Sequence, residues 1–396
     1  MAAAGGIGRA LRVLAAASAV LAAVVAMAAC GPVTPGAQPA VWDSSVIHEI
    51  SIEVDDEEYA GLISTYRETG EKVWIEASVT LDGSTYEHVG IKLKGNSSLR
   101  RLSDNPGAEV SAARPESLPW IIRLDKYVDG QNHQGSAEFV VRGNASKTAL
   151  NEALALEMLD ETGLAATEAI AVELSVNGSP GRLRLVVENP NTAWMERELG
   201  DGLLFKAEPE GDYSYRGEDP EAYADAWDQE GGEDKVEPLL EFLRFINESS
   251  DADFAAGLPQ RLDVDAFATY LAFQAIVDNA DDIDGPGNNS YLFWSPEAER
   301  MTVVNWDLNL AFGGRSEHGA SGNNVLTARF LAHPPFAARY EAELERLHTE
   351  LIASGFAADA LDAWTRLLLD DAGSLIPAAV VTEESDALAA RLGSER

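Results

Sequence analysis

The stretch NWDLNLAFGG, Asn305 to Gly314, directly follows the β-branched run Thr302-Val303-Val304. It places one acid, Asp307, between a tryptophan and a leucine. A carboxylate is costly to bury in such surroundings unless a partner neutralises it. Asp307 therefore either holds a turn together or binds a cation.

The sequence predicts two strands around this acid, at residues 291–294 and 302–306, joined by a short loop. If they pair as an antiparallel hairpin, Asn289 and Asp307 lie side by side at its open end. A carboxylate and an amide beside an acid-rich loop suit Mg²⁺, which takes oxygen ligands from carboxylates, phosphates and water. We therefore expect Asn289 and Asp307 to be metal ligands. The acids of the preceding loop are Asp278, Asp281, Asp282 and Asp284.

The spacing Asp284-x-x-x-x-Asn289 matches the catalytic loop of protein kinases, where the acid accepts a hydroxyl proton and the amide holds a metal. An acid-rich loop produces this spacing by chance, so the signal depends on the hairpin that follows it. A calcium-binding EF-hand is the rival interpretation. It fails because, with Gly285 as the loop glycine, the first and twelfth ligand positions are Ala280 and Tyr291.

Residues 1–29 have the features of an export signal: Arg9 and Arg12, then an apolar segment that is short for a membrane span. The segment ends at Cys30, in a context that resembles a bacterial lipobox, so we expect Cys30 to carry a lipid. An uncleaved anchor helix and a plain signal peptide are the alternatives. Cys30 is the single cysteine of the chain, which excludes an internal disulfide. Residues 30–45, rich in proline, are predicted to be a tether.

The 396-residue chain has a formal net charge of −37, and removing two arginines with residues 1–29 brings it to −39. Such a surface repels nucleic acid and anionic lipid, so we expect no nucleic-acid partner and membrane attachment through the lipid alone. The acidity could also concern only solubility. The hydrophobic fraction of 46% is sufficient for a large core.

The order of predicted elements, strand-rich first and helix-rich later, indicates an α+β fold in which an antiparallel sheet lobe packs on a helical lobe. Residues 212–234 are acidic and predicted to be a loop. The pentads 94–98 and 142–146 echo one another, although five residues are few. The expected strands are 47–54, 74–81, 86–93, 118–127, 172–176 and 182–187, and the expected helices include 55–65, 146–160, 237–246 and 263–277.

Seven motifs follow one another along the chain: LKGNSS, WIIRLDKY, LNEALALEM, LVVEN, LLFKAE, NNSYLF and WDLNLAFGG. Their order is similar to that in the CotH family of secreted, atypical protein kinases, known from bacterial spore coats. The chain resembles this family from about Ile47 to Gly314. The resemblance implies an atypical protein-kinase-like fold, ATP and Mg²⁺ as cofactors, and a protein or small-molecule phosphoacceptor. We place the kinase domain at 46–330, with residues 331–396 completing or flanking it.

The resemblance also implies roles for residues. Asp307 would bind Mg²⁺ and bridge the ATP phosphates, and Asn289 would be the second metal ligand. Asp284 would orient or deprotonate the attacking hydroxyl, with Asp281 as the alternative. A turn of small residues would cover the nucleotide phosphates with its backbone N–H groups. That turn is Lys94-Gly95-Asn96-Ser97-Ser98.

Arg123 stands where the family has an ATP-contacting lysine, and Lys206 is a second candidate for this cation. Glu152 would be the helix acid that pairs with it. Arginine keeps the charge of lysine but not its geometry, so this departure puts the nucleotide site in doubt. A second departure is Asn309, where related sequences often have an acid.

Two function classes remain open. The first is an exported, lipid-anchored kinase at the outer face of the cell membrane. The second is a non-catalytic, pseudokinase-like envelope protein, which Arg123 and Asn309 favour but which has no need for Asp284, Asn289 and Asp307 together. A polysaccharide hydrolase ranks last, because no second acid is placed across from the acidic loop.

Overall fold

Seven strands from the first half of the chain form a closed barrel in the computed structural model, which describes residues 38–95, 98–209, 211–279, 281–284, 288–313 and 324–394. Their order is β1-β2-β3-β4-β5-β7-β6, and a parallel pairing of β1 with β6 closes the ring. The other neighbours pair antiparallel. The alternating pattern of β1 buries Ile50 and Ile52 on one face of the strand. The strands are β1 (Ile47–Val54), β2 (Ile75–Leu81), β3 (Ser84–Leu93), β4 (Trp120–Arg123), β5 (Glu138–Val141), β6 (Ala169–Val176) and β7 (Arg182–Val187).

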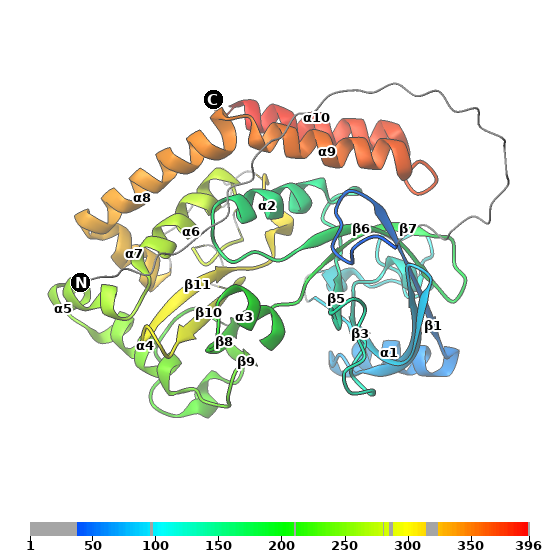
Figure 1. Cartoon of the computed structure of the whole chain (residues 1–396). Helices are drawn as coiled ribbons and strands as arrows, with labels where there is room; N and C mark the ends of the chain where they lie inside the picture. Colours follow the sequence, from blue (N-terminus) through cyan, green and yellow to red (C-terminus); the bar gives the residue numbers. More distant parts are fainter. Residues whose placement is uncertain are drawn as a thin grey trace, which may run out of the picture. The chain divides into compact units, whose positions relative to one another are not determined.

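A second sheet, ordered β11-β10-β8-β9, lies among the helices of the later part of the chain (Figure 1). All three of its pairings are antiparallel. Its strands are β8 (Leu203–Ala207), β9 (Trp227–Gly231), β10 (Ser290–Ser295) and β11 (Arg300–Asn305). The helices are α1 (Asp56–Thr69), α2 (Leu150–Glu161), α3 (Thr192–Glu198), α4 (Glu237–Glu248), α5 (Asp251–Gly257), α6 (Val264–Ile276), α7 (Val325–Ala332), α8 (Pro334–Leu347), α9 (Phe356–Asp371) and α10 (Ala378–Ser394).

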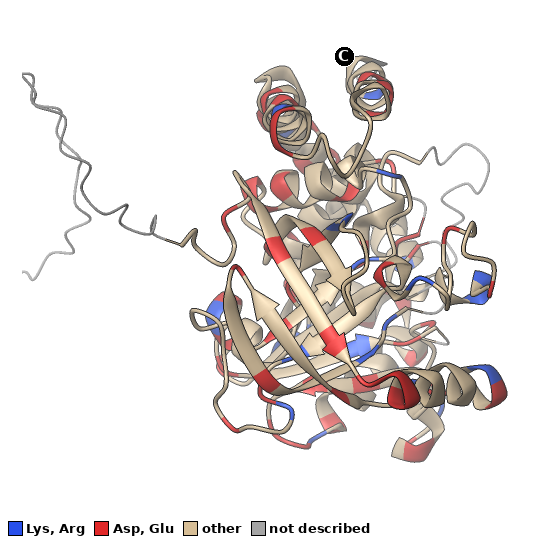
Figure 2. Cartoon of the chain, turned by 90° about the vertical axis from the view of Figure 1, so that its right-hand side faces the viewer, with Lys and Arg blue, Asp and Glu red and all other residues tan. Residues whose placement is uncertain are grey.

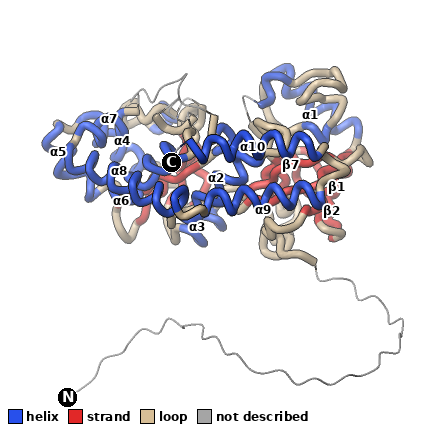
Figure 3. Tube along the Cα trace, turned by 90° about the horizontal axis from the view of Figure 1, so that it is seen from above, coloured by secondary structure: helices blue, strands red, loops and turns tan. Residues whose placement is uncertain are grey.

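Three hydrophobic clusters hold residues 39–396 together as one compact unit. One fills the barrel, and one lies between the second sheet and the helices α4 and α6. The third joins α2, the outer face of the barrel and the second sheet, and it includes Leu361 and Trp364 of α9. Helices α9 and α10 run side by side (Figure 3). The C-terminal helices thus cover α2, which carries Glu152.

The structure confirms the mixed α and β character and the local hairpins, but it differs from the predicted sheet. The first sheet is a closed barrel with a parallel pair, and a second sheet lies among the helices. Residues 212–234, predicted as a loop, contain β9, and β5 was not predicted at all. Helix α2 begins at Leu150 instead of Ser146, because Ala149 has a left-handed φ of 58° and its N–H bonds the Ser146 hydroxyl at 2.9 Å.

Acidic side chains are spread over strands and helices, while basic side chains are few (Figure 2). Among the described residues, no helix is long and apolar enough to cross a membrane. Cys30, the expected signal segment and the first part of the tether lie outside the described residues.

Candidate functional site

The hairpin predicted around Asp307 is present. Strands β10 and β11 pair antiparallel, with Ser290 opposite Asn305, so Asn289 and Asp307 lie at the same open end. Asn289 has a φ of 58° and Asp307 a φ of 59°. Left-handed backbone at non-glycine residues is unfavourable and recurs at functional sites. Asn289, just before β10, and Asp307, just after β11, therefore both lie at the open end of the hairpin.

Arg142, at the end of β5, links Asp307 to α2. Its Nη2 donates to Asp307 Oδ1, and its Nε lies 2.8 Å from Glu152 Oε1. Arg142 is 7% exposed and Glu152 is 3% exposed. Although burial lowers the pKa of Arg142, the charges of Asp307 and Glu152 raise it overall, so the guanidinium stays charged. Burial and the charge of Asp307 raise the pKa of Glu152 against the opposing effect of Arg142.

The prediction that Glu152 pairs with Arg123 or Lys206 was therefore wrong, because Glu152 pairs with Arg142. Arg123 pairs instead with Asp125 at 2.8 Å and Glu138 at 3.3 Å, and its side chain is 41% exposed. Pairing with Arg142 was not predicted because β5 was not predicted. A signal existed in the echoing pentads, since Arg142 begins the second as Lys94 begins the first.

Lys94 and Arg142 lie over the same indole ring. Lys94 Nζ and Arg142 Cζ are each 5.6 Å from the ring centroid of Trp306. The two pentads are also neighbours in space, because a Cβ added at Gly143 would lie 3.0 Å from Ser98 Cβ. Gly95 has a φ of 90°, which favours glycine. Asn96 and Ser97 lie outside the described residues, while Ser98 begins a 3₁₀ turn.

Cations from the barrel and from the second sheet face one another near Lys94. Burial lowers the pKa of Lys94 to about 8, and the charge of Lys206 on β8 adds to this. Lys206 is paired with Glu208 and stands opposite Tyr291 in the sheet register. Lysines brought this close favour an anion between them. Sequence reasoning missed three other members of this charged group: Lys72, Lys92 and Glu230.

Asp281 belongs to the surroundings of Asp307. Its backbone carbonyl accepts a hydrogen bond of 2.7 Å from Asn289 Nδ2. Burial, followed by the charge of Asp307, raises the pKa of Asp281 to about 6. The three residues Asp281, Asn289 and Asp307 are thus brought together.

Asp284 has a different environment. Asp284 is 6% exposed, and its backbone N–H donates a hydrogen bond of 3.0 Å to Asp282 Oδ1. Its Oδ1 is buried with no hydrogen-bond partner in the described part of the chain. Burying a carboxylate oxygen without a hydrogen bond costs free energy, unless a ligand or a water molecule donates one to it. Both acids remain candidates for orienting a hydroxyl.

The residues at the hairpin end fit a magnesium ion that is also held by phosphate. No group of three or more His, Cys, Asp or Glu side chains in the described ranges is placed to hold a metal alone. One carboxylate, Asp307, and one amide, Asn289, match the small protein ligand set that Mg²⁺ uses when phosphate and water complete its shell. A cation here would also oppose the charge of Asp307, which after burial is the second cause of the raised pKa of Asp281.

An acid and an amide at a hairpin end, with lysines nearby, form a kind of site that phosphoryl transfer can use. Comparison with known families identifies a kinase-like protein. The chain matches the family described as CotH kinase protein over residues 91–372, and it belongs to that family. No curated protein gives a significant match.

A solved structure from Shewanella oneidensis MR-1, of the toxin–antitoxin system HipA and HipB with its operator DNA, matches with 14% identity and a TM-score of 0.32. The match covers 68% of this chain and 62% of that chain. A similarity of this size carries no argument about fold or function here.

Proposed function

We propose that this chain is an exported, membrane-anchored atypical kinase that transfers the γ-phosphoryl group of ATP to a hydroxyl, with protein Ser or Thr as the first acceptor class to test. One observation carries the proposal: Asp307 pairs with Arg142 and lies in the field of Asp281. Lys94 of the barrel shares the Trp306 ring with Arg142, and the charge of Lys206 from the second sheet acts on Lys94. Phosphoryl transfer needs positioning and charge neutralisation more than a protein nucleophile.

In this proposal Asp307 and Asn289 hold Mg²⁺, which when bound neutralises charge on the phosphate oxygens. Lys94 and Lys206 bind the phosphates. Asp284, or alternatively Asp281, orients the acceptor hydroxyl and accepts its proton.

Arg142 is a positioning residue in the same scheme. It is held by Glu152 and in turn orients Asp307. The family lysine position, Arg123, makes its ion pairs with Asp125 and Glu138 and has no role in this scheme.

The test is nucleotide-dependent protection of the full chain against thermal unfolding, with and without Mg²⁺, followed by transfer of labelled γ-phosphate to a protein acceptor. Ligands that bind the native state raise its stability. We expect ATP to protect the wild type only with Mg²⁺, and Asp307→Ala to abolish this protection. Asp104→Ala is the control, because Asp104 is a surface acid whose side chain is 79% exposed. A folded protein that no nucleotide protects would reject the proposal.

A second candidate, a non-catalytic pseudokinase-like envelope protein, is favoured by one observation. Arg142 already occupies Asp307 Oδ1, which leaves one carboxylate oxygen of Asp307 for a metal. This candidate predicts nucleotide or metal binding without phosphoryl transfer to any acceptor. The labelled transfer assay therefore separates the two, since only the kinase incorporates phosphate.

A further inference from the structure

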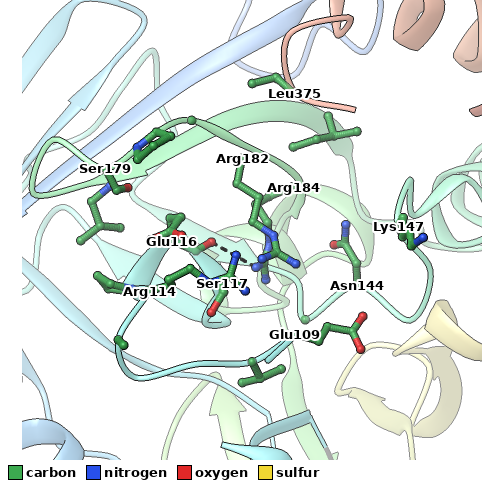
Figure 4. A pocket seen from close by; sticks show the side chains of 18 of the residues that line it. Glu109, Arg114, Glu116, Ser117, Asn144, Lys147, Ser179, Arg182, Arg184 and Leu375 are labelled. Carbon is green, nitrogen blue, oxygen red and sulfur yellow. Dashed lines mark hydrogen bonds between the residues drawn. The ribbon is translucent and has the colours of Figure 1, made fainter. Parts of the chain in front are cut away.

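Apart from the candidate site, a cavity of about 800 Å³ opens at one end of the barrel (Figure 4). Its wall is formed by the loop before β4, the turn between β6 and β7, the segment that follows β5, and the connection between α9 and α10. Asp307, Asn289, Lys94 and Lys206 do not line it. The function proposed above leaves this cavity without a role.

Four cations line the cavity: Arg114, Lys147, Arg182 and Arg184. None of them forms an ion pair in the described part of the chain, although acids outnumber Lys and Arg by 66 to 29 in the sequence. Glu109 and Glu116 also line the wall, and their charges act on Arg182 and Arg184, but no salt bridge joins either acid to these cations in the described residues. In so acidic a chain, four unpaired cations around one cavity indicate a place for an anion.

The surroundings of Arg184 give the strongest indication of an anion site. It is 3% exposed, and it donates Nη1 to the Glu116 carbonyl at 3.2 Å and Nη2 to the Arg142 carbonyl. Its Nε is buried with no partner among the described residues. Burial, followed by the charge of Arg182, lowers the pKa of Arg184 to about 9, against the opposing charges of Glu116 and Glu109. A buried guanidinium that forms no salt bridge is costly, so an anion in contact with it would stabilise it further.

Arg182 lies two residues before Arg184 on β7, so both side chains leave the strand on the same face. Figure 4 shows the two guanidinium groups close together, with Asn144 and Lys147 on the neighbouring segment. Two arginine forks on one face suit oxyanions, because each fork offers parallel N–H donors.

A purely structural role for Arg184, tying together two backbone carbonyls, accounts for its Nη1 and Nη2. It does not account for Nε, for the neighbouring Arg182, or for Arg114, whose Nε is also buried without a partner. We propose that the barrel-end cavity binds a small oxyanion, a phosphate or carboxylate group, through Arg182 and Arg184. This site is distinct from the candidate nucleotide site, although Arg142 contributes its carbonyl to one and its guanidinium to the other.

The test is calorimetric titration of the full chain with inorganic phosphate at constant ionic strength, repeated with citrate as the carboxylate probe. We expect one of the two to bind, and Arg182→Gln to weaken that binding at least about tenfold, because one charge-assisted contact is lost. Arg182 makes no hydrogen bond through its side chain in the described structure and is half-buried, so its variant should fold. If the Arg184→Gln variant folds, it tests the same site.

Two controls locate the binding. Lys235→Gln removes an exposed cation outside the cavity, and Lys94→Gln removes one from the candidate nucleotide site. Lys235→Gln should leave the affinity unchanged, and Lys94→Gln should leave intact the binding that Arg182→Gln weakens. Absence of binding by both probes, or binding that Lys94→Gln abolishes and Arg182→Gln does not, would overturn the proposal. The ATP protection assay uses Asp307→Ala, so failure of either proposal is seen separately.

Discussion

Asp281 and Asp284 differ in what surrounds their carboxylates, and substitution should separate their roles. Asp281 lies in the field of Asp307 and holds Asn289, whereas Asp284 has a buried oxygen without a partner in the described residues. We expect Asp284→Asn to lower kcat about 10²–10⁴-fold at unchanged Mg²⁺ requirement, the usual loss when a general base is removed. Asp281→Asn should instead change the Mg²⁺ concentration needed for half-maximal activity.

Initial rates over a range of Mg²⁺ concentrations measure both effects. Asp278→Asn, in the same loop, is the matched control for a general change in loop charge. The assignment would be reversed if Asp281→Asn lost kcat while Asp284→Asn altered only the response to metal.

Lys94 gives the site a pH dependence. Burial lowers its pKa to about 8, so the free site loses this cation as the pH rises through 8. Because phosphate binding favours the charged lysine, the affinity for ATP should fall by up to about tenfold per pH unit above 8. Titrations of the wild type and of Lys94→Arg between pH 7 and 9 measure it. Arginine keeps its charge in this range, so the fall should disappear, whereas Lys235→Arg, at an exposed site, should behave as wild type.

At the scale of elements, Arg142 joins the ends of β5 and β11 to α2. Replacing it with methionine leaves Glu152 buried and Asp307 without its counter-ion. Breaking a buried ion pair in this way costs about 3–5 kcal/mol, and we expect a loss of that size in urea unfolding of Arg142→Met. Arg67→Met, which breaks a pair on the surface, should change stability by about 0–1 kcal/mol.

The single variant Glu152→Gln and the double variant Arg142→Met/Glu152→Gln complete the cycle. Removing the stranded charge of Glu152 should recover part of the lost stability, so the two changes should not be additive. Additive losses would mean that the ion pair does not determine how α2 is held.

Helix α10 holds the segment after β5 through one acid. Glu384 accepts hydrogen bonds from the N–H groups of Lys147 and Thr148, both at 3.0 Å, and from the Thr148 hydroxyl. Although burial opposes them, these bonds lower the pKa of Glu384. An acid with a lowered folded pKa stabilises the protein above its ordinary value of 4.5, and this stabilisation is lost as the pH falls below it.

Glu384→Gln should therefore destabilise the protein by about 1 kcal/mol at pH 7, since the hydrogen bonds to a charge become neutral in a partly exposed site. The difference from wild type should vanish near pH 3, where both side chains are uncharged. Urea unfolding at both pH values measures it, and Glu383→Gln on the exposed side of α10 is the control. A difference that persisted in acid would show that the shape of the amide, rather than the charge, is responsible.

Local patterns explain which elements could be predicted from the sequence. The β10–β11 hairpin follows from two alternating runs and a short loop, and it places Asn289 and Asp307 together. The parallel pairing of β1 with β6 and the pairing of Glu152 with Arg142 join residues whose contact depends on the assembled barrel. A four-residue strand such as β5 has too few positions to show a period, so the cation at its end was missed.

At the scale of the whole molecule, the export prediction rests on residues outside the described structure and is tested in cells. We expect the full chain, produced in a bacterium that lipidates exported proteins, to be in the membrane fraction. Cys30→Ser should release it, because one thioether-linked lipid is the proposed anchor. Fractionation with immunodetection measures this. A Cys30→Ser protein that stayed with the membrane would support the uncleaved anchor helix, while export of unlipidated wild type would support a plain signal peptide.

The net charge of −37 determines how the whole molecule should respond to salt. Screening weakens the repulsion among acids, but it also weakens ion pairs. Most ion pairs in the described part have at least one exposed partner and contribute about 0–1 kcal/mol each, and the buried set around Arg142 is screened little. Repulsion should therefore dominate, and the Tm should rise between about 10 mM and 500 mM NaCl, as calorimetry can measure. A falling Tm would mean that the surface pairs outweigh the excess of acids.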